Sequence, residues 1–382
     1  MCIRDRTIIP LTTLFFELIQ ISLGNRKEFS CIPSAKDWLG IYELAHRQAL
    51  TGVLFTGITL LPKKQTPPQK LLLKWYAISE QIRILNKRIN KECIIVGNHL
   101  KEKGFDYAIL KGQSMAALYT FPLLRMPGDI DVWLHPAKTS ECSLSLVRKS
   151  VLELARDKGK LEGVTYCHVH YPLLKDTEVE LHFTPSWMNG FADNKRLQKF
   201  FMEQASVQFS NEIELPDISE NINSPTIEFN RFYILLHIYR HLFGEGIGLR
   251  QLMDYYYVLH RPASEDSKKR TLDILQQMGM TRFASAVMFV MQKVFGLKNN
   301  YLILPPDIKE GRFLLSEIMR SGNFGKFDKR IRRSSRMKYA PIRFAFSLKR
   351  NCTFFKHYPH EVLTDAPFRI WLYFWRKWHG WI

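Results

Sequence analysis

The stretch from Tyr107 to His135 constrains the fold of this chain more than any other part of its sequence. It reads YAILKGQSMAALYTFPLLRMPGDIDVWLH. The apolar run 107–110 is long enough for a buried strand. A small polar turn follows at 111–114, and 115–119 favours a short helix. A strand, a glycine turn and a helix in this order predict part of an α+β core.

The second half of this stretch places two carboxylates side by side. In GDIDVWL (128–134), Asp129 and Asp131 alternate with apolar residues, and alternate side chains on a strand share a face. Adjacent carboxylates repel each other unless a cation lies between them, and Mg²⁺ prefers oxygen ligands together with substrate phosphates. Because a glycine turn that opens a helix offers backbone N–H groups to phosphate, the stretch predicts a phosphate site beside a metal site.

Two patterns in this stretch resemble known families. G-x-S at 112–114 followed by D-I-D at 129–131 resembles the signature of the DNA polymerase β-like nucleotidyltransferase superfamily. The longer pattern, LKG at 110–112 and LRxxGDID at 124–131, is similar to an uncharacterised bacterial family of nucleotidyltransferases. A weaker similarity to that family extends from Asp37 to about His260.

The resemblance implies transfer of a nucleoside monophosphate from an NTP, most simply ATP, to an unidentified hydroxyl group on a small molecule or a protein. It implies two Mg²⁺ ions, or Mn²⁺, held by Asp129 and Asp131 with a third carboxylate from a neighbouring strand. VELH at 179–182 follows a predicted hairpin, which makes Glu180 the candidate. Glu178 shares its face and stays an alternative, as does a plain solvent-facing edge strand.

The resemblance also implies a nucleotide-binding set around the same turn. Gly112 and Ser114 would hold the β- and γ-phosphates. Lys111 and Arg125 flank the site and would neutralise phosphate charge. An ordinary surface lysine and a loop-anchoring arginine are equally consistent with the sequence.

A second helical region, 226–260, contains HIYRHLFGEGIGLRQLMD. His237 and His241 lie one helical turn apart, but zinc binding needs a further ligand, so packing between helices is the commoner outcome. The resemblance favours His182, His241 and Arg250 as residues that face the substrate. Asp254 lies one turn after Arg250 and is placed to pair with it.

The predicted fold is α+β, with a small mixed sheet that carries helices on one side and helical regions before and after it. Apolar spacing predicts a helix at 12–23 and one long helix at 69–103. Strands are expected at 164–173 and 178–183. The expected domains are an N-terminal helical region (7–95), a nucleotidyltransferase-like catalytic core (96–205), a C-terminal helical domain (206–300) and a basic, aromatic-rich tail (301–382).

Charge and composition narrow the partners. The formal charge is +19, which favours anionic partners. From Arg320 onward there are fifteen Lys or Arg and three Asp or Glu, a net +12. This tail favours nucleic acid, an anionic membrane surface or helices docked with their basic side chains in water. Six cysteines without C-x-x-C spacing indicate a reducing, cytoplasmic setting, and no apolar run reaches the length of a transmembrane segment.

Three functions compete at this point. The first is an active Mg²⁺-dependent nucleotidyltransferase, which the presence of all three carboxylates favours. The second is a catalytically silent nucleotide-binding or regulatory module, and the third is an RNA-directed nucleotidyltransferase or RNA binder that uses the basic tail. The repulsion between Asp129 and Asp131 further predicts that neutralising either one leaves the fold as stable as before, or more so.

Overall fold

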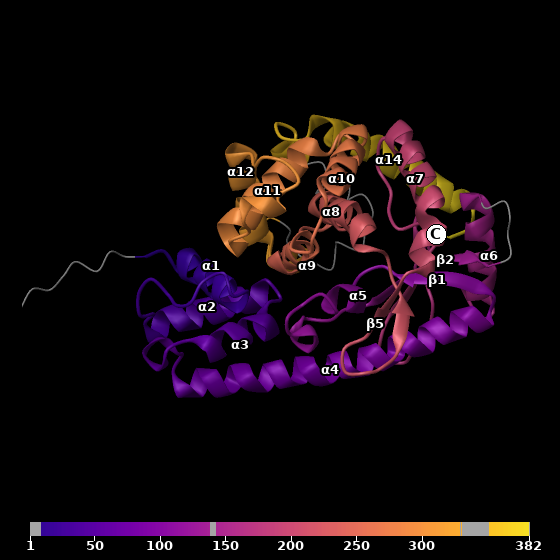
Figure 1. The fold of residues 1–382 in the computed structure, drawn as a ribbon. Coiled ribbons are helices and arrows are strands. Elements are labelled where there is room, and N and C mark those ends of the chain that lie inside the picture. The colour runs from indigo at the N-terminus through magenta and orange to yellow at the C-terminus, as the bar shows by residue number, and fades with distance from the viewer. Residues whose placement is uncertain (1–8, 138–142, 329, 331–350, 382) are drawn as a thin grey trace, which may run out of the picture.

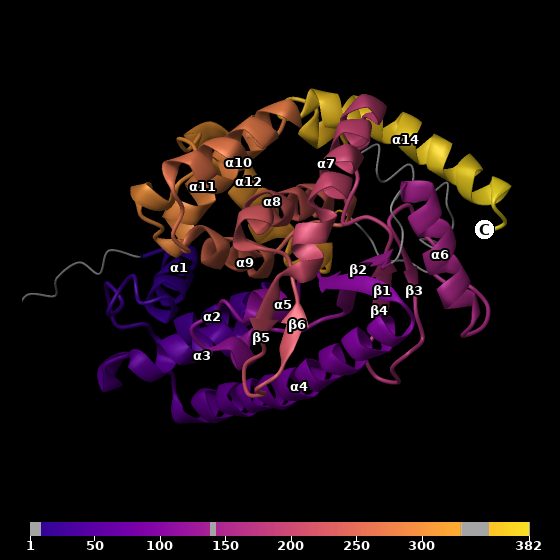
Figure 2. The same cartoon turned by 45° about the vertical axis from the view of Figure 1, so that its right-hand side comes forward.

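The computed structural model describes residues 9–137, 143–328, 330 and 351–381. Helices dominate, and a small mixed sheet lies among them (Figures 1 and 2). The predicted α+β class with helical flanks is confirmed.

The elements follow one another in three groups. The N-terminal helices are α1 (Leu11–Ser22), α2 (Ala35–Arg47), α3 (Thr51–Leu60) and α4 (Gln69–Glu102), with the 3-10 turn η1 (Lys63–Gln65) before α4. The middle group is β1 (Phe105–Ile109), α5 (Gln113–Ala116), η2 (Pro122–Leu124), β2 (Ile130–Pro136), α6 (Leu144–Arg156), β3 (His168–His170), β4 (Val179–His182), α7 (Phe191–Ser210), β5 (Glu212–Glu214) and β6 (Asn221–Asn223). The last group is α8 (Ile227–Gly244), α9 (Leu249–Leu259), α10 (Glu265–Gln277), α11 (Thr281–Phe295), η3 (Asn299–Tyr301), α12 (Ile308–Ser321), η4 (Asn323–Gly325) and α14 (Pro359–Trp378).

Helix α4 runs beneath both the N-terminal helices and the sheet (Figure 1). Its 34 residues give a length of about 51 Å. Its inward side chains recur at intervals of three and four residues, among them Trp75, Ile82, Ile89, Cys93, Val96 and Leu100. Gly104, with φ +79°, ends the helical run and turns the chain into β1. The single long helix predicted here is therefore confirmed, as is the helix predicted near residues 12–23.

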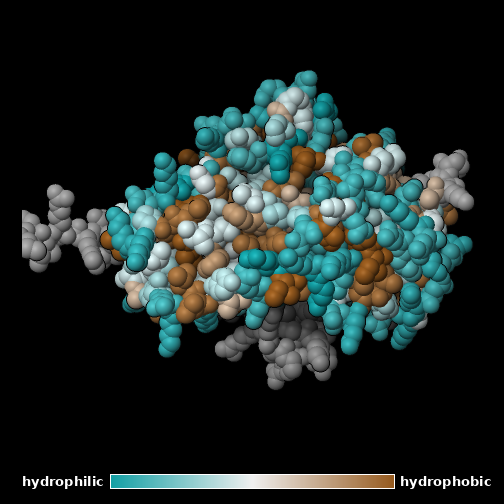
Figure 3. Space-filling view, turned by 60° about the horizontal axis from the view of Figure 1, so that its bottom comes forward, coloured by the Kyte–Doolittle hydropathy of each residue, from teal (hydrophilic) through white to brown (hydrophobic). Residues whose placement is uncertain are grey.

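The outer side of α4 keeps several large apolar side chains in solvent, namely Leu73, Tyr76, Ile84 and Ile95. Figure 3 shows the face of the molecule from this side, where apolar and hydrophilic surface are interspersed. Such scattered apolar residues are normal on a protein surface.

The four-stranded sheet has the order β1-β2-β4-β3. β2 pairs antiparallel with β1 and parallel with β4, while β3 pairs antiparallel with β4. The register places Asp131 opposite Glu180. The strand expected at 164–173 is shorter, because only His168–His170 pairs with β4, and Asp129 lies just before β2 rather than within it.

The two faces of the sheet differ in chemistry. Val132, Leu181 and their neighbours on one face form a buried cluster with side chains of α4 and α6. The other face carries Asp131, Glu180 and Trp133, and Trp133 packs against Phe209 of α7 and against α8. The sequence predicted helices on one side of the sheet, whereas in the structure helices contact both faces, because α7 and α8 reach the polar face through Trp133.

The N-terminal helices do not form an isolated core. Helix α1 packs against α3 and α11, and its buried residues belong to the same hydrophobic cluster as those of α8, α9 and α11. The domain boundaries at residues 95, 205 and 300 stay predictions. None of the described helices combines the length and the apolar character that a membrane span requires.

The predicted basic tail is described in part, since residues 331–350 lie outside the described ranges. Phe354, Tyr358 and Phe368 are buried, and Glu361 forms an ion pair with Arg240 of α8. The inner side of α14 and the segment before it are thus docked on the body of the protein, as the docked-helix interpretation expects.

Candidate functional site

Three carboxylates converge at the polar face of the sheet. Asp131 comes from β2, Glu180 from the neighbouring β4, and Asp129 from the residue before β2. One oxygen of each lies within 4.8 Å of the others. The Asp131 side chain is 1% exposed, that of Glu180 15% and that of Asp129 39%. The cluster therefore runs from a buried carboxylate to a solvent-accessible one.

Lys111 supplies the charge that allows these carboxylates to lie together. Its Nζ is 2.9 Å from Asp131 Oδ2 and 4.0 Å from Asp129 Oδ2. Burial opposes the charge on Lys111, but the two carboxylates raise its pKa above the ordinary value. Burial likewise opposes ionisation of Asp131, while Lys111 and His182 hold the pKa of that carboxyl well below its usual range. The lysine ammonium thus lies where a cation is required.

His182 belongs to the carboxylate cluster and is buried there, although the sequence suggested that it faces the substrate. Its Nε2 lies 2.9 Å from Asp131 Oδ1 and 3.3 Å from Glu180 Oε2. Burial disfavours the imidazolium, but these two hydrogen bonds raise the pKa of His182 to about 9. Burial and the nearby Asp131 raise the pKa of Glu180. The cluster is therefore a coupled set of charges.

In metal-free protein, this coupling predicts that stability falls as the pH rises from 6.5 towards about 8, a range still below the ordinary pKa of cysteine. A His182 pKa raised from 6.5 to about 9 contributes stability fully present below 6.5 and lost as the pH approaches 9. Asp131, whose pKa is lowered, stays ionised throughout. Histidines with lowered pKa values, such as His168 and His237, change the free energy of unfolding only below about pH 6.5. With EDTA present, the urea midpoint of the wild type should fall as the pH rises from 6.5 to about 8, and that of His182→Gln should stay constant. A wild-type midpoint that does not change with pH would contradict the assignment to His182.

The turn after β1 holds Gly112 in a conformation that suits glycine. Its φ is +66° and ψ −112°, and it precedes α5. Gly112 lines the neighbouring pocket. Ser114 is buried, and its Oγ donates to the Lys111 carbonyl at 3.4 Å. Of the two residues predicted to contact phosphate, the structure therefore places Gly112 at the pocket and Ser114 in α5, with its side chain buried.

Arg125 is buried in an ion pair with Asp254 of α9. Its Nε and Nη2 donate to the two carboxylate oxygens of Asp254 at 2.7 and 2.8 Å, and the Tyr119 hydroxyl donates to the same carboxylate at 2.6 Å. The sequence suggested that Asp254 pairs with Arg250. In the structure it pairs with Arg125, which lies on the loop before Asp129. This geometry matches the loop-anchoring alternative and ties the loop before Asp129 to α9.

Arg125→Met should lower the free energy of unfolding by about 3–5 kcal/mol, because it leaves the buried Asp254 carboxylate without its partner. The double variant Arg125→Met/Asp254→Leu should recover much of that loss, since it removes both charges. Denaturant unfolding of the two variants and Asp254→Leu completes the cycle. Additive losses in the double variant would show that the pair contributes nothing as a pair.

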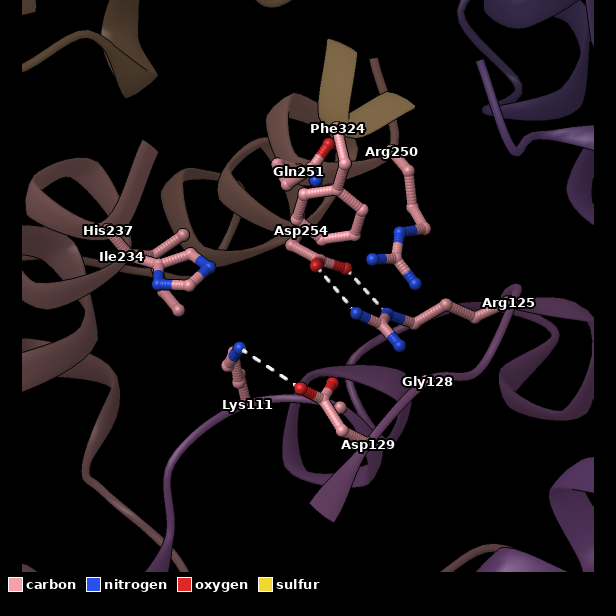
Figure 4. A pocket seen from close by; sticks show the side chains of 11 residues that line it. Lys111, Arg125, Gly128, Asp129, Ile234, His237, Arg250, Gln251, Asp254 and Phe324 are labelled. Carbon is pink, nitrogen blue, oxygen red and sulfur yellow. Dashed lines mark hydrogen bonds and ion pairs between the residues drawn. The ribbon is translucent and has the colours of Figure 1, made fainter. Parts of the chain in front are cut away.

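A pocket opens between the three carboxylates of the sheet and the C-terminal helices (Figure 4). Asp129 and Lys111 lie on its sheet side, while Arg250 and Phe324 lie on its helical side. Arg250 is buried and donates through Nη1 to the Met126 carbonyl at 3.0 Å, and its guanidinium lies 5.3 Å from the centre of the Phe324 ring. The remaining lining residues are Gly112, Arg125, Gly128, Ile234, His237, Gln251 and Asp254.

Of the residues predicted to face the substrate on this side, Arg250 lines the pocket and His241 does not. The ring centre of His241 lies 4.3 Å from that of His237 and 5.1 Å from that of Phe324, two residues that do line the pocket. His237, which the sequence assigned to packing, lines the pocket instead. A helical pattern places two histidines on one face, but it cannot tell which of them reaches a cavity.

Phe324 was missed by the sequence analysis because it depends on two loops that meet in space. A Cβ on Gly248 would lie 2.8 Å from Asn323 Cα, and one on Gly325 would lie 1.9 Å from the Glu245 carbonyl. The glycines therefore allow backbone to pack on backbone, and Phe324 adopts φ +50° there. GEGIG at 244–248 and SGNFG at 321–325 were the available signals.

The donor set fits a hard divalent cation. Three carboxylates that converge beside an open pocket are the oxygen ligands that Mg²⁺ and Mn²⁺ take. Asp129 is accessible from the pocket, and the Lys111 ammonium has neighbouring carboxylates on either side. The fold and the site together define an α+β protein with a carboxylate centre of the divalent-cation type.

Comparison with known proteins identifies the family. Residues 34–296 match the family model described as "Uncharacterised nucleotidyltransferase", and the chain belongs to this family. The predicted resemblance to an uncharacterised nucleotidyltransferase family is thereby confirmed. No curated protein matches the chain. A crystal structure of an antigenic nucleotidyltransferase-like protein from Paracoccidioides brasiliensis matches at 14% identity, over 57% of this chain and 98% of that one. Its TM-score of 0.30 is too low to support an argument about fold or function.

Proposed function

We propose that the protein is a divalent-metal-dependent nucleotidyltransferase of the DNA polymerase β-like superfamily, which transfers a nucleoside monophosphate from an NTP, most simply ATP, to a hydroxyl group. The observation that carries this proposal is the convergence of Asp129, Asp131 and Glu180 within 4.8 Å, in a chain of a nucleotidyltransferase family. The acceptor is a small molecule or a protein.

Each residue has a role in this proposal. Asp129, Asp131 and Glu180 would hold Mg²⁺ or Mn²⁺, and such ions, when bound, neutralise phosphate charge and lower the pKa of an attacking hydroxyl. Gly112 faces the pocket beside Asp129 and offers its backbone N–H to phosphate. Lys111 would turn from the carboxylates to the phosphates once a metal ion occupies its place. Arg125 positions the loop through Asp254, and Arg250 faces the nucleotide or the acceptor.

Nucleotide binding tests this proposal before an acceptor is known. Calorimetric titration with the α,β-methylene analogue of ATP and Mg²⁺ should show saturable binding that EDTA removes. Asp129→Asn should weaken it at least tenfold, or by about 1.4 kcal/mol. Asp129 is the variant of choice because it is more exposed than Asp131. Asp106→Asn, an exposed aspartate on β1, is the matched control. Equal affinity in Asp129→Asn and the wild type would contradict the proposal.

The outer face of α14 supports a separate proposal for the tail, namely contact with an anionic lipid surface. Its exposed apolar residues are Leu363, Ile370, Trp371, Tyr373, Phe374 and Trp378. Lys377 is exposed on the same helix, and Lys356 is exposed just before the helix begins. Within the described residues 351–381 the acidic side chains are Glu361 and Asp365, and both are buried. An apolar and aromatic stripe flanked by cations suits the headgroup region of an anionic bilayer, and the aliphatic members favour lipid over stacked bases.

Vesicle sedimentation checks this surface. We expect binding to vesicles that contain phosphatidylserine, weaker binding to phosphatidylcholine alone, and a loss of affinity as salt rises. Phe374→Ser/Trp378→Ser should reduce it, whereas Leu73→Ser/Tyr76→Ser on α4 should not. Binding of RNA in preference to vesicles would instead support the RNA-directed alternative.

A further inference from the structure

The polar face of the sheet carries more metal-type ligands than the three carboxylates. β4 lies between β2 and β3, so its side chains meet those of both neighbours. Glu180 has Asp131 on one side and His170 on the other, while His182 has His168 beside it on β3. Because alternate residues share a face, the register assembles carboxylates and imidazoles into adjacent rows.

The distances within this array match those between ligands of one ion. Glu180 Oε2 lies 3.1 Å from His168 Nδ1 and 3.3 Å from His182 Nε2, which is itself 2.9 Å from Asp131 Oδ1. Around an ion with bonds of about 2.1 Å, neighbouring ligand atoms are roughly 3.0 Å apart in octahedral and 3.4 Å apart in tetrahedral geometry. His168, Glu180 and His182 also form a set in which one ligand atom of each lies within 4.8 Å of the others.

We propose that His168, Glu180 and His182 form a second metal position, which takes a divalent transition-metal ion such as Zn²⁺, Co²⁺ or Mn²⁺. Two imidazoles and a carboxylate favour such ions, whereas Mg²⁺ prefers oxygen ligands alone. Glu180 belongs to this set and to the Asp129–Asp131 set. The carboxylate therefore links a histidine-rich position to an all-oxygen position that opens on the pocket.

Burial distinguishes His168 and His182 from the third histidine of the array, His170. The side chains of His168 and His182 are 19% and 8% exposed, whereas that of His170 is 39% exposed and bonded to the still more exposed Glu178. A metal ion between His168 and His182 would be shielded from bulk water. His170 belongs to a different and more exposed set with Glu178 and Glu180, and its Nε2 lies 3.6 Å from Glu180 Oε1. His170→Gln is therefore the matched control that distinguishes the two sets.

This inference deepens the proposed function, because it concerns a metal of the same centre, but its test uses no nucleotide. Full-length protein freed of metal by chelation is titrated with Co²⁺ alone, and the visible absorption of bound Co²⁺ is followed. We expect one strong site from which Zn²⁺ displaces Co²⁺ and excess Mg²⁺ does not. His168→Gln should weaken it at least tenfold, and His170→Gln should change it less than threefold. X-ray absorption of the Zn²⁺-loaded protein should show two imidazoles in the wild type and one in His168→Gln.

His168→Gln is the primary variant because His168 lies at the edge of the cluster, and His182→Gln, which is more buried, is the second. Circular dichroism and melting curves establish that each is folded. Unchanged Co²⁺ affinity in folded His168→Gln, or displacement of Co²⁺ by Mg²⁺ alone, would overturn the inference and show that the imidazoles only hydrogen-bond to the carboxylates. Binding of the Mg²⁺-nucleotide analogue in the same preparations is scored separately, so the proposed function survives or fails independently.

Discussion

Asp131→Asn should lower the free energy of unfolding of the metal-free protein by about 3–5 kcal/mol, the usual cost of breaking a buried ion pair. It should also abolish binding of the Mg²⁺-nucleotide complex. The Asp131 carboxylate is buried and lies 2.9 Å from both Lys111 Nζ and His182 Nε2. Its loss leaves the half-buried Lys111 ammonium and the buried His182 imidazolium with less compensation. Urea unfolding in EDTA measures the first effect, and calorimetry the second.

Asp129→Asn is the matched variant and should change the free energy of unfolding by less than about 1 kcal/mol, as expected for an exposed charge. Repulsion alone predicted that both substitutions are harmless to stability. The structure changes that expectation for Asp131. Its carboxylate is buried and pairs with both Lys111 and His182, so neutralising it removes more attraction than repulsion. Equal stability of Asp131→Asn and the wild type would show that these cations do not compensate it.

Lys111→Met should move metal affinity and nucleotide affinity in opposite directions. Without nucleotide, the Lys111 ammonium, 2.9 Å from Asp131 Oδ2, competes with a divalent ion for the same carboxylate. An ion pair at this distance is worth several kcal/mol even at an effective dielectric constant of about 20. Its removal should tighten Mn²⁺ binding at least tenfold.

The same variant should weaken binding of the Mg²⁺-nucleotide analogue, because the phosphates lose a cation. Calorimetry with Mn²⁺ alone and with the analogue measures both effects. Lys103→Met, an exposed lysine at the end of α4, is the control and should change neither. Unchanged Mn²⁺ affinity in Lys111→Met would contradict the idea that the ammonium occupies the place of a metal ion.

Local pattern was sufficient to predict much of the fold. The spacing of Trp75, Ile82 and Ile89 predicted one long α4, and alternation around Asp131 and Glu180 predicted the strands that carry them. These features depend on neighbours in sequence, for which period and propensity are informative. The bounds of β3 were predicted less well, since pairing with β4 decides where that strand ends.

The site was predictable only where one segment supplies it. D-I-D and V-E-L-H drew attention to the three carboxylates, but no sequence pattern shows that Asp131 is buried against Lys111. Arg125 and Arg250 both follow family-like patterns, yet only packing decides that Asp254 binds the former. Phe324 reaches the pocket because glycines in two distant loops allow their backbones to touch, a relation with no local signature.

The measurement that tests the central claim most directly uses NTPs labelled on different phosphates. Full-length protein is incubated with Mg²⁺ or Mn²⁺, a cell extract and each NTP labelled at either the α- or the γ-phosphate. The account predicts that α-label is transferred to an acceptor, that γ-label leaves as pyrophosphate, and that both signals vanish in Asp129→Asn, the variant that keeps its stability. Incorporation of γ-label would indicate phosphoryl transfer instead. Absence of α-label transfer from every NTP, by protein that binds the Mg²⁺-nucleotide complex, would contradict the account and favour a silent nucleotide-binding module.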